Sequence, residues 1–161
     1  MSRCALVQEI PDRAYAASSF ELIKDRPFSF FLDSGMDEGK LGRYSFIGCD
    51  PFLVLKSTGR KVSISYRGRL ECVDADPFEV LRSLLLRYSL DPPDSPVPFN
   101  CGAVGYFGYD LCHLVERLPA TAVDDLKLPE CCLCFYDVVV AFDQYEGRTY
   151  VVSTGLPELD E

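Results

Sequence analysis

The sequence predicts an α+β fold of mainly antiparallel sheets packed with a few helices. Short apolar and β-branched stretches recur along the chain with turn residues between them, which is typical of strands that are joined locally. Polar and apolar residues alternate in Lys61-Val62-Ser63-Ile64-Ser65-Tyr66, as expected for a strand with one wet face and one dry face. Helical spacing of apolar residues is confined to short stretches, so strands are expected to outnumber helices.

Five strands are expected in the first half of the chain, over residues 4–10, 28–33, 43–48, 52–57 and 61–66. Glycine-containing turns at 58–60 and 67–69 predict that residues 52–74 form an antiparallel meander. Two further strands are expected near the end of the chain, over 132–142 and 148–153, with a turn between them.

Two helices are expected. The first begins at Asp76, which can cap it, with Pro77 in the first helical position and Glu79 completing a capping box. Its apolar residues recur at helical spacing and predict a stripe packed on a sheet: Phe78, Leu81, Leu84, Leu85 and Tyr88. A shorter helix is expected over 109–118 and is ended by Pro119.

The run of glycines and aromatic residues from Phe99 to Asp110 predicts close backbone packing rather than a phosphate site. A dinucleotide loop needs Gly-x-Gly-x-x-Gly, and a phosphate loop needs Lys and Ser or Thr after its last glycine; this run has neither pattern. Glycines in a strand instead mark the close approach of another backbone. The aromatic residues between them, Tyr106, Phe107 and Tyr109, are expected to supply buried area.

The composition excludes several classes of partner. The chain has 161 residues, with 16 Lys and Arg against 25 Asp and Glu, which gives a formal net charge of −9. Such a chain repels nucleic acid and anionic membrane surfaces, so neither is expected as a partner. The first apolar run breaks too early for a signal peptide, and no stretch approaches the roughly 18 apolar residues of a membrane span. A single domain in the cytoplasm is therefore expected.

Eight cysteines are present, five scattered and three clustered: Cys4, Cys49, Cys72, Cys101, Cys112, Cys131, Cys132 and Cys134. Reduced thiols are expected, because the sequence shows no secretion signal. The clustered cysteines lack the spacing of zinc ligands and open an apolar strand, where a thiol packs as a small hydrophobe.

No catalytic residue and no metal ligand is predicted. His113 is the only histidine and has no nucleophile signature around it, so a partly exposed structural histidine is expected. Asp124 and Asp125 could hold a metal, but no third carboxylate has the required spacing, and a solvated loop pair is expected instead.

Three motifs that occur in a fixed order identify a family resemblance. Leu32-Asp33-Ser34 is followed by Gly42-Arg43-Tyr44-Ser45-Phe46-Ile47-Gly48 and, about sixty residues later, by Gly105-Tyr106-Phe107-Gly108-Tyr109-Asp110. Together they resemble the N-terminal region of component I of the chorismate-using synthases, which are anthranilate synthase and aminodeoxychorismate synthase. The resemblance covers nearly the whole chain.

The resemblance implies that the catalytic machinery lies elsewhere. In the family, the residues that bind chorismate and Mg²⁺ belong to a C-terminal domain. Residues 1–161 are accordingly expected to be a single N-terminal component I domain without that domain, and inactive by itself. Residues 151–161 resemble a cut between the last strand and the linker beyond it. The implied partners are the C-terminal domain of the parent chain, a glutamine amidotransferase subunit that supplies ammonia, and Mg²⁺ in the parent.

The resemblance also implies a ligand site. In family members the Leu-x-Ser element lines a tryptophan pocket that is completed by C-terminal residues. Carried over, the candidate site residues are Asp33, Ser34, Arg43, Tyr44, Ser45 and Phe46. A carboxylate can pair with an amino group, a hydroxyl adds a directional hydrogen bond, and aromatic rings pack an indole. A strand-ending turn without a ligand explains the same residues, and Asp33 stands where anthranilate synthases usually carry Glu.

Residues 116–119, 125–130 and 136–137 look more like aminodeoxychorismate synthase than anthranilate synthase. The anthranilate enzyme remains the alternative within the family. A stand-alone module that binds an amino acid or a partner protein is the alternative from a different class.

Overall fold

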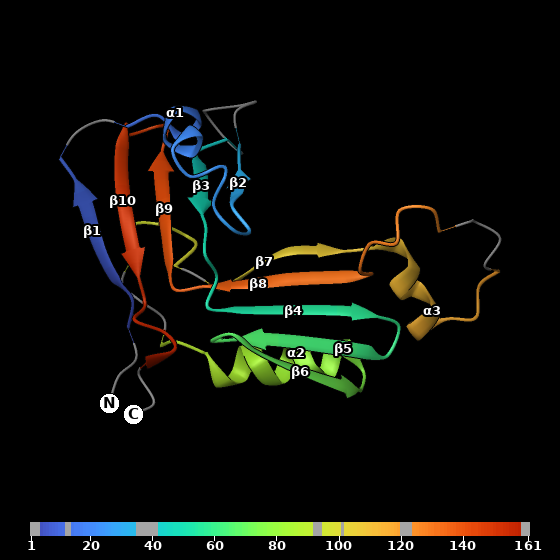
Figure 1. Cartoon of the computed structure of the whole chain (residues 1–161). Helices are drawn as coiled ribbons and strands as arrows, with labels where there is room; N and C mark the ends of the chain where they lie inside the picture. Colours follow the sequence, from blue (N-terminus) through green and yellow to red (C-terminus); the bar gives the residue numbers. More distant parts are fainter. Residues whose placement is uncertain are drawn as a thin grey trace. The chain divides into compact units, whose positions relative to one another are not determined.

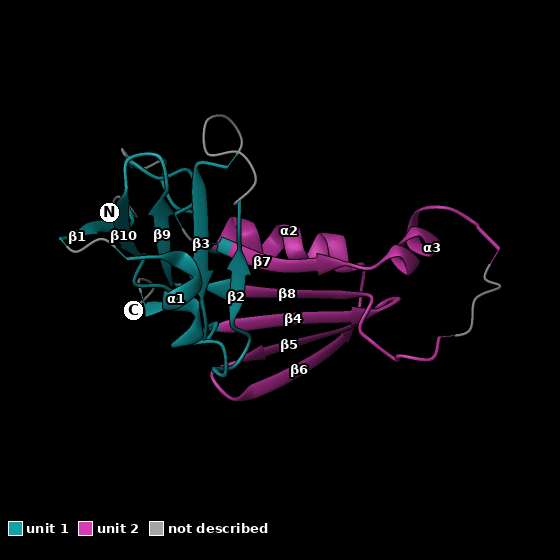
Figure 2. Ribbon diagram, turned by 90° about the horizontal axis from the view of Figure 1, so that it is seen from above, with its two compact units in different colours: residues 1–52, 88–102, 135–161 teal, residues 53–87, 103–134 magenta. Residues whose placement is uncertain are grey.

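The computed structural model describes residues 4–11, 14–34, 42–91, 95–100, 102–119 and 124–158. The predicted thiol Cys101 and the last three residues of the predicted chain end lie outside these ranges. The chain divides into two compact units, the first formed by residues 1–52, 88–102 and 135–161 and the second by residues 53–87 and 103–134 (Figure 2). Both units are built on antiparallel strands, so the predicted α+β class is confirmed.

Unit 1 contains a five-stranded sheet in the order β1-β10-β9-β3-β2 (Figure 1). Its strands are β1 (Leu6–Ile10), β2 (Phe30–Leu32), β3 (Tyr44–Gly48), β9 (Val138–Asp143) and β10 (Arg148–Ser153). Every pairing in it is antiparallel. The central β9 lies between β10 and β3, so the end of β9 at Asp143 is opposite Tyr44 and Arg148. This register is what builds the site described below.

The helix α1 (Ala16–Glu21) lies beside β3 in unit 1. Phe20 of this helix stacks on Phe31 of β2, with ring centroids 5.3 Å apart. On the opposite face of the sheet, Val139, Ala141 and Val152 are fully buried.

Unit 2 contains most of a second five-stranded sheet, in the order β6-β5-β4-β8-β7 (Figure 1). Its strands are β4 (Leu53–Thr58), β5 (Lys61–Tyr66), β6 (Arg69–Asp74), β7 (Gly102–Phe107) and β8 (Cys131–Tyr136). The predicted meander over 52–74 is confirmed, because β4 pairs with β5 and β5 with β6 in antiparallel register. Helix α2 (Pro77–Arg87) runs along one face of this sheet, and η1 (Tyr109–Leu111) with α3 (Cys112–Val115) follows β7.

The middle of the glycine-aromatic run forms β7, and Gly105 in this strand permits the close approach of the β8 backbone. A Cβ on Gly105 would overlap the carbonyl oxygen of Cys132 and lie 2.9 Å from the Cα of Leu133. The predicted burial of its aromatic residues is wrong. Tyr106, Phe107 and Tyr109 are 42%, 54% and 84% exposed, because they stand at the end of the strand and on η1 beyond it.

The single strand predicted over 132–142 is also wrong. The segment forms two strands, β8 and β9, which bend at Asp137 and belong to different sheets. The apolar residues run on through the bend, so periodicity alone could not reveal it. The short helix α1 was not predicted, since it has no side-chain cap and only six residues.

Helix α2 begins as predicted, and its buried stripe is narrower than predicted. The Asp76 carboxylate accepts the Phe78 backbone N–H at 2.8 Å, whereas the Glu79 carboxylate lies 3.6 Å from Arg82 along the helix. Leu84 is buried, but Phe78 and Leu85 are 40% and 46% exposed. The predicted helix over 109–118 is shorter and ends at Val115. In the described part of the chain no helix is long and apolar enough to cross a bilayer.

Candidate ligand-binding site

The antiparallel pairing of β2 and β3 brings Asp33 and Ser45 together. The Ser45 hydroxyl is fully buried and donates a hydrogen bond to the Asp33 carboxylate at 2.8 Å. The same oxygen accepts the side-chain amide of Gln144 at 2.6 Å and the backbone N–H of Ser34 at 3.4 Å. Ser45 therefore joins the end of β2 to the β9–β10 turn, and it orients Asp33 with one carboxylate oxygen already hydrogen-bonded.

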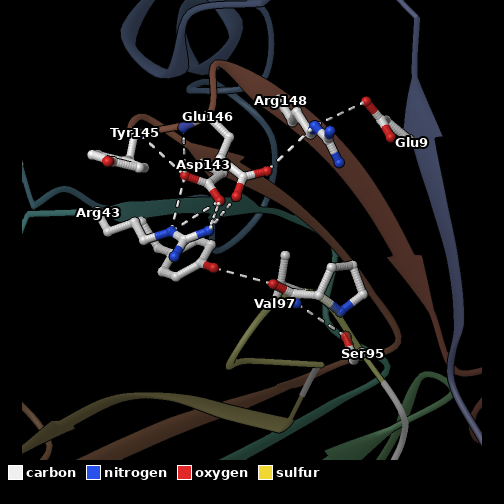
Figure 3. Close-up of polar contacts among 10 residues, drawn as sticks. Glu9, Arg43, Ser95, Val97, Asp143, Tyr145, Glu146 and Arg148 are labelled. Atoms are coloured by element: carbon white, nitrogen blue, oxygen red, sulfur yellow. Dashed lines mark hydrogen bonds and ion pairs between the residues drawn. The ribbon is translucent and has the colours of Figure 1, made fainter.

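The neighbouring Arg43 is held by a buried carboxylate 100 residues further along the chain (Figure 3). Its Nε and Nη2 both donate to Asp143, with the Nη2 contact at 2.6 Å. Asp143 is only 2% exposed, and it also accepts the backbone N–H groups of Tyr145 and Glu146 at 3.1 and 3.0 Å. A paired and hydrogen-bonded carboxylate of this kind is stable when buried, whereas an unpaired one is not.

The electrostatics of this pair favour the charged forms. Burial opposes ionisation of Asp143, but the hydrogen bonds from Arg43 and from the Glu146 and Tyr145 N–H groups outweigh it and hold its pKa below the usual range. The hydrogen bond to Asp143 likewise raises the pKa of Arg43. Burial raises the pKa of the adjacent Tyr44 phenol, and the Asp143 charge adds to that effect.

A chain of charges extends outward from Arg43 (Figure 3). The Glu146 carboxylate lies 3.2 Å from Arg43 Nη2 and 3.4 Å from Arg148 Nε, which is 3.8 Å from Glu9. The guanidinium of Arg43 also lies over the rings of Tyr44 and Tyr145, 5.0 and 5.7 Å from their centroids. Of the three guanidinium nitrogens of Arg43, only Nη1 has no hydrogen bond to a described residue, so the capacity of Arg43 to hold a further anion is small.

Tyr44 and Phe46 point to the opposite face of the sheet from Ser45, because side chains alternate along β3. The Tyr44 hydroxyl donates to the carbonyl of Pro96 at 3.1 Å, and Phe46 packs edge-on against Phe99 at 5.5 Å. The six residues predicted as a site are thus divided. Asp33 and Ser45, with the backbone of Ser34, form one cluster on the α1 face, and Arg43, Tyr44 and Phe46 form another with Asp143.

A cavity of about 300 Å³ opens beside the first cluster in unit 1. Asp33, Asp143, Gln144 and Arg148 supply its polar lining. Tyr15, Phe31 and Phe142 supply its aromatic lining. The carboxylate can accept an amino group, the guanidinium can face an acid group, and the rings can pack an apolar side chain. The cavity therefore has the size and the chemistry to accept a small zwitterion.

Sequence reasoning missed Asp143, Gln144 and Arg148. The turn at 144–147 was predicted, and an Asp just before such a turn is a common acceptor for its N–H groups. The pairing of that carboxylate with Arg43 depends on strand order in the sheet, for which the local sequence carries no signal.

The other predicted groups lie apart from this site. Asp124 accepts the backbone N–H of Lys127 in an exposed loop, and His113 is exposed on α3. Seven of the cysteines fall within the described residues, where none forms a disulfide. No three His, Cys, Asp or Glu side chains come together to hold a metal in that part of the chain.

Comparison with known proteins identifies the class. Anthranilate synthase component 1 of Acetivibrio thermocellus is 36% identical over 137 residues, which cover 84% of this chain and 28% of the relative. Aminodeoxychorismate synthase component 1 of Escherichia coli K12 is 30% identical over 135 residues, covering 83% of this chain and 30% of the relative. The crystal structure of anthranilate synthase component I from Streptococcus pneumoniae TIGR4 shares the fold, with a TM-score of 0.59, 24% identity and coverage of 71% of this chain and 25% of that one. No protein family model matches.

The chain is therefore a member of the component I family of anthranilate and aminodeoxychorismate synthases. It corresponds to the N-terminal part of those proteins and spans less than a third of the length of the relatives it matches. The predicted family resemblance is confirmed, and both members of the family are represented among the relatives.

Proposed function

We propose that this chain is the N-terminal part of an aminodeoxychorismate synthase component I, which replaces the hydroxyl group of chorismate with an amino group on the cytoplasmic route to 4-aminobenzoate and folate. The observation that carries the proposal is similarity to component I over more than 80% of the chain. Residues 116–119, 125–130 and 136–137 support the choice of this member of the family.

Anthranilate synthase component I is the second candidate, with a specific observation in its favour. The identity to the Acetivibrio thermocellus protein is 36%, against 30% for the Escherichia coli aminodeoxychorismate synthase protein. This enzyme aminates a different position of chorismate and releases pyruvate, so the two candidates differ in their products.

In either case we assign this chain a binding role rather than the chemical step. Asp33, Ser34 and Ser45 would provide the polar end of a tryptophan-type pocket, with the Asp33 carboxylate facing the amino group of the ligand. The hydrogen bond from Ser45 to Asp33 supports this role, because it fixes one carboxylate oxygen, while the other has no hydrogen bond to a described residue. The remainder of component I would cover the indole.

Two further requirements come from outside this chain. A glutamine amidotransferase subunit would supply ammonia, and Mg²⁺ would act with chorismate in the parent protein. The described residues do not fit a magnesium site, since no three metal-ligating side chains converge there. No step that uses the metal is therefore assigned to residues of this chain.

The test is product identification with the parent component I, chorismate, Mg²⁺ and ammonium salt in place of the amidotransferase. Aminodeoxychorismate without pyruvate supports the first candidate, and anthranilate with equimolar pyruvate supports the second. Formation of neither product contradicts both. The 161-residue chain alone is the matched control and is expected to leave chorismate unchanged; turnover by it would contradict the binding role.

A further inference from the structure

Unit 2 carries a groove where β7 ends and β8 begins. The groove has a volume of about 310 Å³ and is separate from the cavity in unit 1. Its two walls are tied together by main-chain and side-chain hydrogen bonds. Gly108 N–H donates to the Glu130 carbonyl at 2.6 Å, and the Tyr106 hydroxyl donates to the Pro129 carbonyl at 3.0 Å. A groove built in this way is ordered before anything enters it, which lowers the entropic cost of binding.

Large apolar side chains stand exposed in and beside the groove. Leu126 and Leu128 line it and are 72% and 60% exposed, and Tyr106 lines it at 42% exposure. Tyr109, next to the lining residues Gly108 and Asp110, is 84% exposed. Exposed aromatic and aliphatic side chains that gather around a concave surface are typical of protein interaction sites.

The charged lining of the groove is of one sign. Asp110, Asp124, Asp125 and Glu130 line it, and none of its lining residues is Lys or Arg. Glu130 is engaged by the Gly59 N–H at 2.8 Å, and Asp124 by Lys127. Within the described part of the chain, the side-chain carboxylates of Asp110 and Asp125 have no hydrogen-bond or ion-pair partner. These carboxylates do not converge as metal ligands would, since no group of three is close enough to hold an ion.

We propose that this acidic groove is a docking site for a segment of another protein that carries Lys or Arg beside apolar side chains. Its lining residues are Thr58, Tyr106, Gly108, Asp110, Asp124, Asp125, Leu126, Leu128, Pro129 and Glu130. Charge complementarity selects the partner: a basic segment would pair with Asp110 and Asp125 while its apolar residues cover Leu126 and Leu128. An acidic segment would be repelled at the same place. The role of the groove is independent of the reaction that the parent protein catalyses.

The test uses three labelled synthetic peptides with this chain. One alternates leucine and lysine, the second replaces lysine with glutamate, and the third replaces leucine with serine. Fluorescence anisotropy is expected to show binding of the leucine–lysine peptide alone, weakened several-fold when salt is raised to about 0.5 M, where the screening length is a few ångströms. No binding of that peptide, or equal binding of either other peptide, overturns the proposal.

Variants in the groove, with matched controls on β6, test whether the peptide binds in the groove. Leu126→Ser and Asp125→Asn are each expected to weaken binding of the leucine–lysine peptide by about fivefold or more. The controls are Leu70→Ser and Glu71→Gln on β6, where Leu70 is 70% exposed, close to the 72% of Leu126. The controls are expected to leave affinity unchanged. All four positions are exposed, so the variants should fold, as circular dichroism would verify. Equal effects at both places, or no effect in the groove, overturn the proposal.

A second copy of the chain is a further possible occupant, and sedimentation equilibrium distinguishes it from a basic partner segment. A monomer is expected at all concentrations used for the peptide titration. A dimer that Leu126→Ser dissociates would show that the groove takes another copy, and it would overturn the assignment to a basic partner.

Discussion

Asp143 has more polar contacts than any other residue of the candidate site. Its carboxylate is buried and accepts two N–H groups of Arg43 and the backbone N–H groups of Tyr145 and Glu146. Removal of the carboxylate would leave the Tyr145 and Glu146 N–H groups without this acceptor, and Arg43, whose side chain is 41% exposed, would keep only Glu146 and water. The cost of such a loss exceeds the net worth of the ion pair itself.

Asp143→Ala is expected to lower the free energy of unfolding by about 2–4 kcal/mol, less than for a fully buried pair because the Arg43 side chain is 41% exposed. Asp143→Asn should cost less, about 1–3 kcal/mol, because its amide oxygen can still accept the turn N–H groups. Urea denaturation at neutral pH measures both. Asp74→Asn is the matched control, since Asp74 also pairs with an arginine, Arg60 at 3.1 Å, but is 76% exposed. A change near zero is expected there; equal losses at the two sites would contradict the importance of burial.

The pH dependence of the free energy of unfolding should also reflect the ionisation of Asp143. The pKa of Asp143 is lowered in the folded protein, so its contribution is complete above the unfolded pKa of about 4 and is lost as the pH falls through the folded value. The difference in free energy of unfolding between the wild type and Asp143→Asn is therefore expected to be constant from about pH 8 to about pH 5. It is expected to shrink below about pH 4. A difference that grows on acidification would contradict the assignment.

The thiols differ in reactivity through burial. Cys131 is 1% exposed, and burial raises its pKa to about 11, whereas Cys72 is exposed. At the same pH this shift alone makes the reactive thiolate of Cys131 roughly a hundredfold scarcer than that of an ordinary cysteine. Thiol labelling of the folded protein is expected to modify Cys72 early and Cys131 last.

In denaturant without reductant all eight thiols should titrate; a lower count would indicate a disulfide.

At the scale of elements, strands were predictable where a local pattern exists. The predicted bounds of 61–66 and 148–153 match β5 and β10, because alternation and flanking turns define both ends of each strand. The division of 132–142 at Asp137 was missed, since a change of sheet leaves the apolar run intact. The exposure of the Tyr109 ring was also missed, because the local sequence does not distinguish an exposed aromatic residue from a buried one.

Gly105 tests the close packing of β7 against β8. A Cβ at this position would overlap the Cys132 carbonyl, and backbone cannot move aside as a side chain can. Gly105→Ala is expected to lower the free energy of unfolding by about 3 kcal/mol or more. Gly68→Ala is the control: its φ of 75° carries a strain of about 1 kcal/mol, but nothing lies within 4 Å. Comparable losses in urea denaturation would contradict the role of close approach.

At the scale of the molecule, the candidate site depends on distant parts of the sequence. Asp33 and Ser45 lie in two separate family motifs, and their hydrogen bond follows from the local pairing of β2 with β3. Gln144 and Asp143 come from a hairpin 100 residues away, and only the strand order β10-β9-β3-β2 places them there. The division of the predicted residues between two faces of the sheet follows from the alternation of side chains along β3 and has a consequence for binding.

Tryptophan binding should be weak in this chain and stronger in the parent protein. Asp33 and the cavity beside it offer a polar end, but Tyr44 and Phe46 are turned to the other face and cannot cover the indole on this one. Burial of an aromatic side chain contributes roughly 1.5–3 kcal/mol, and about 1.4 kcal/mol is a factor of ten in affinity. Loss of half that burial, together with some hydrogen bonds, should weaken binding at least about tenfold relative to full-length component I.

Isothermal titration of the 161-residue chain is therefore expected to show little or no heat with tryptophan. In the full-length protein, Ser34→Ala should weaken binding further, because a polar group of the ligand would be buried without a partner. Thr58→Ala is the control, since Thr58 is exposed, belongs to unit 2 and does not line the cavity beside Asp33. Tight binding by the chain alone would show that the pocket is complete in this unit. An unchanged affinity in the full-length Ser34→Ala variant would make Ser34 a turn residue without a ligand.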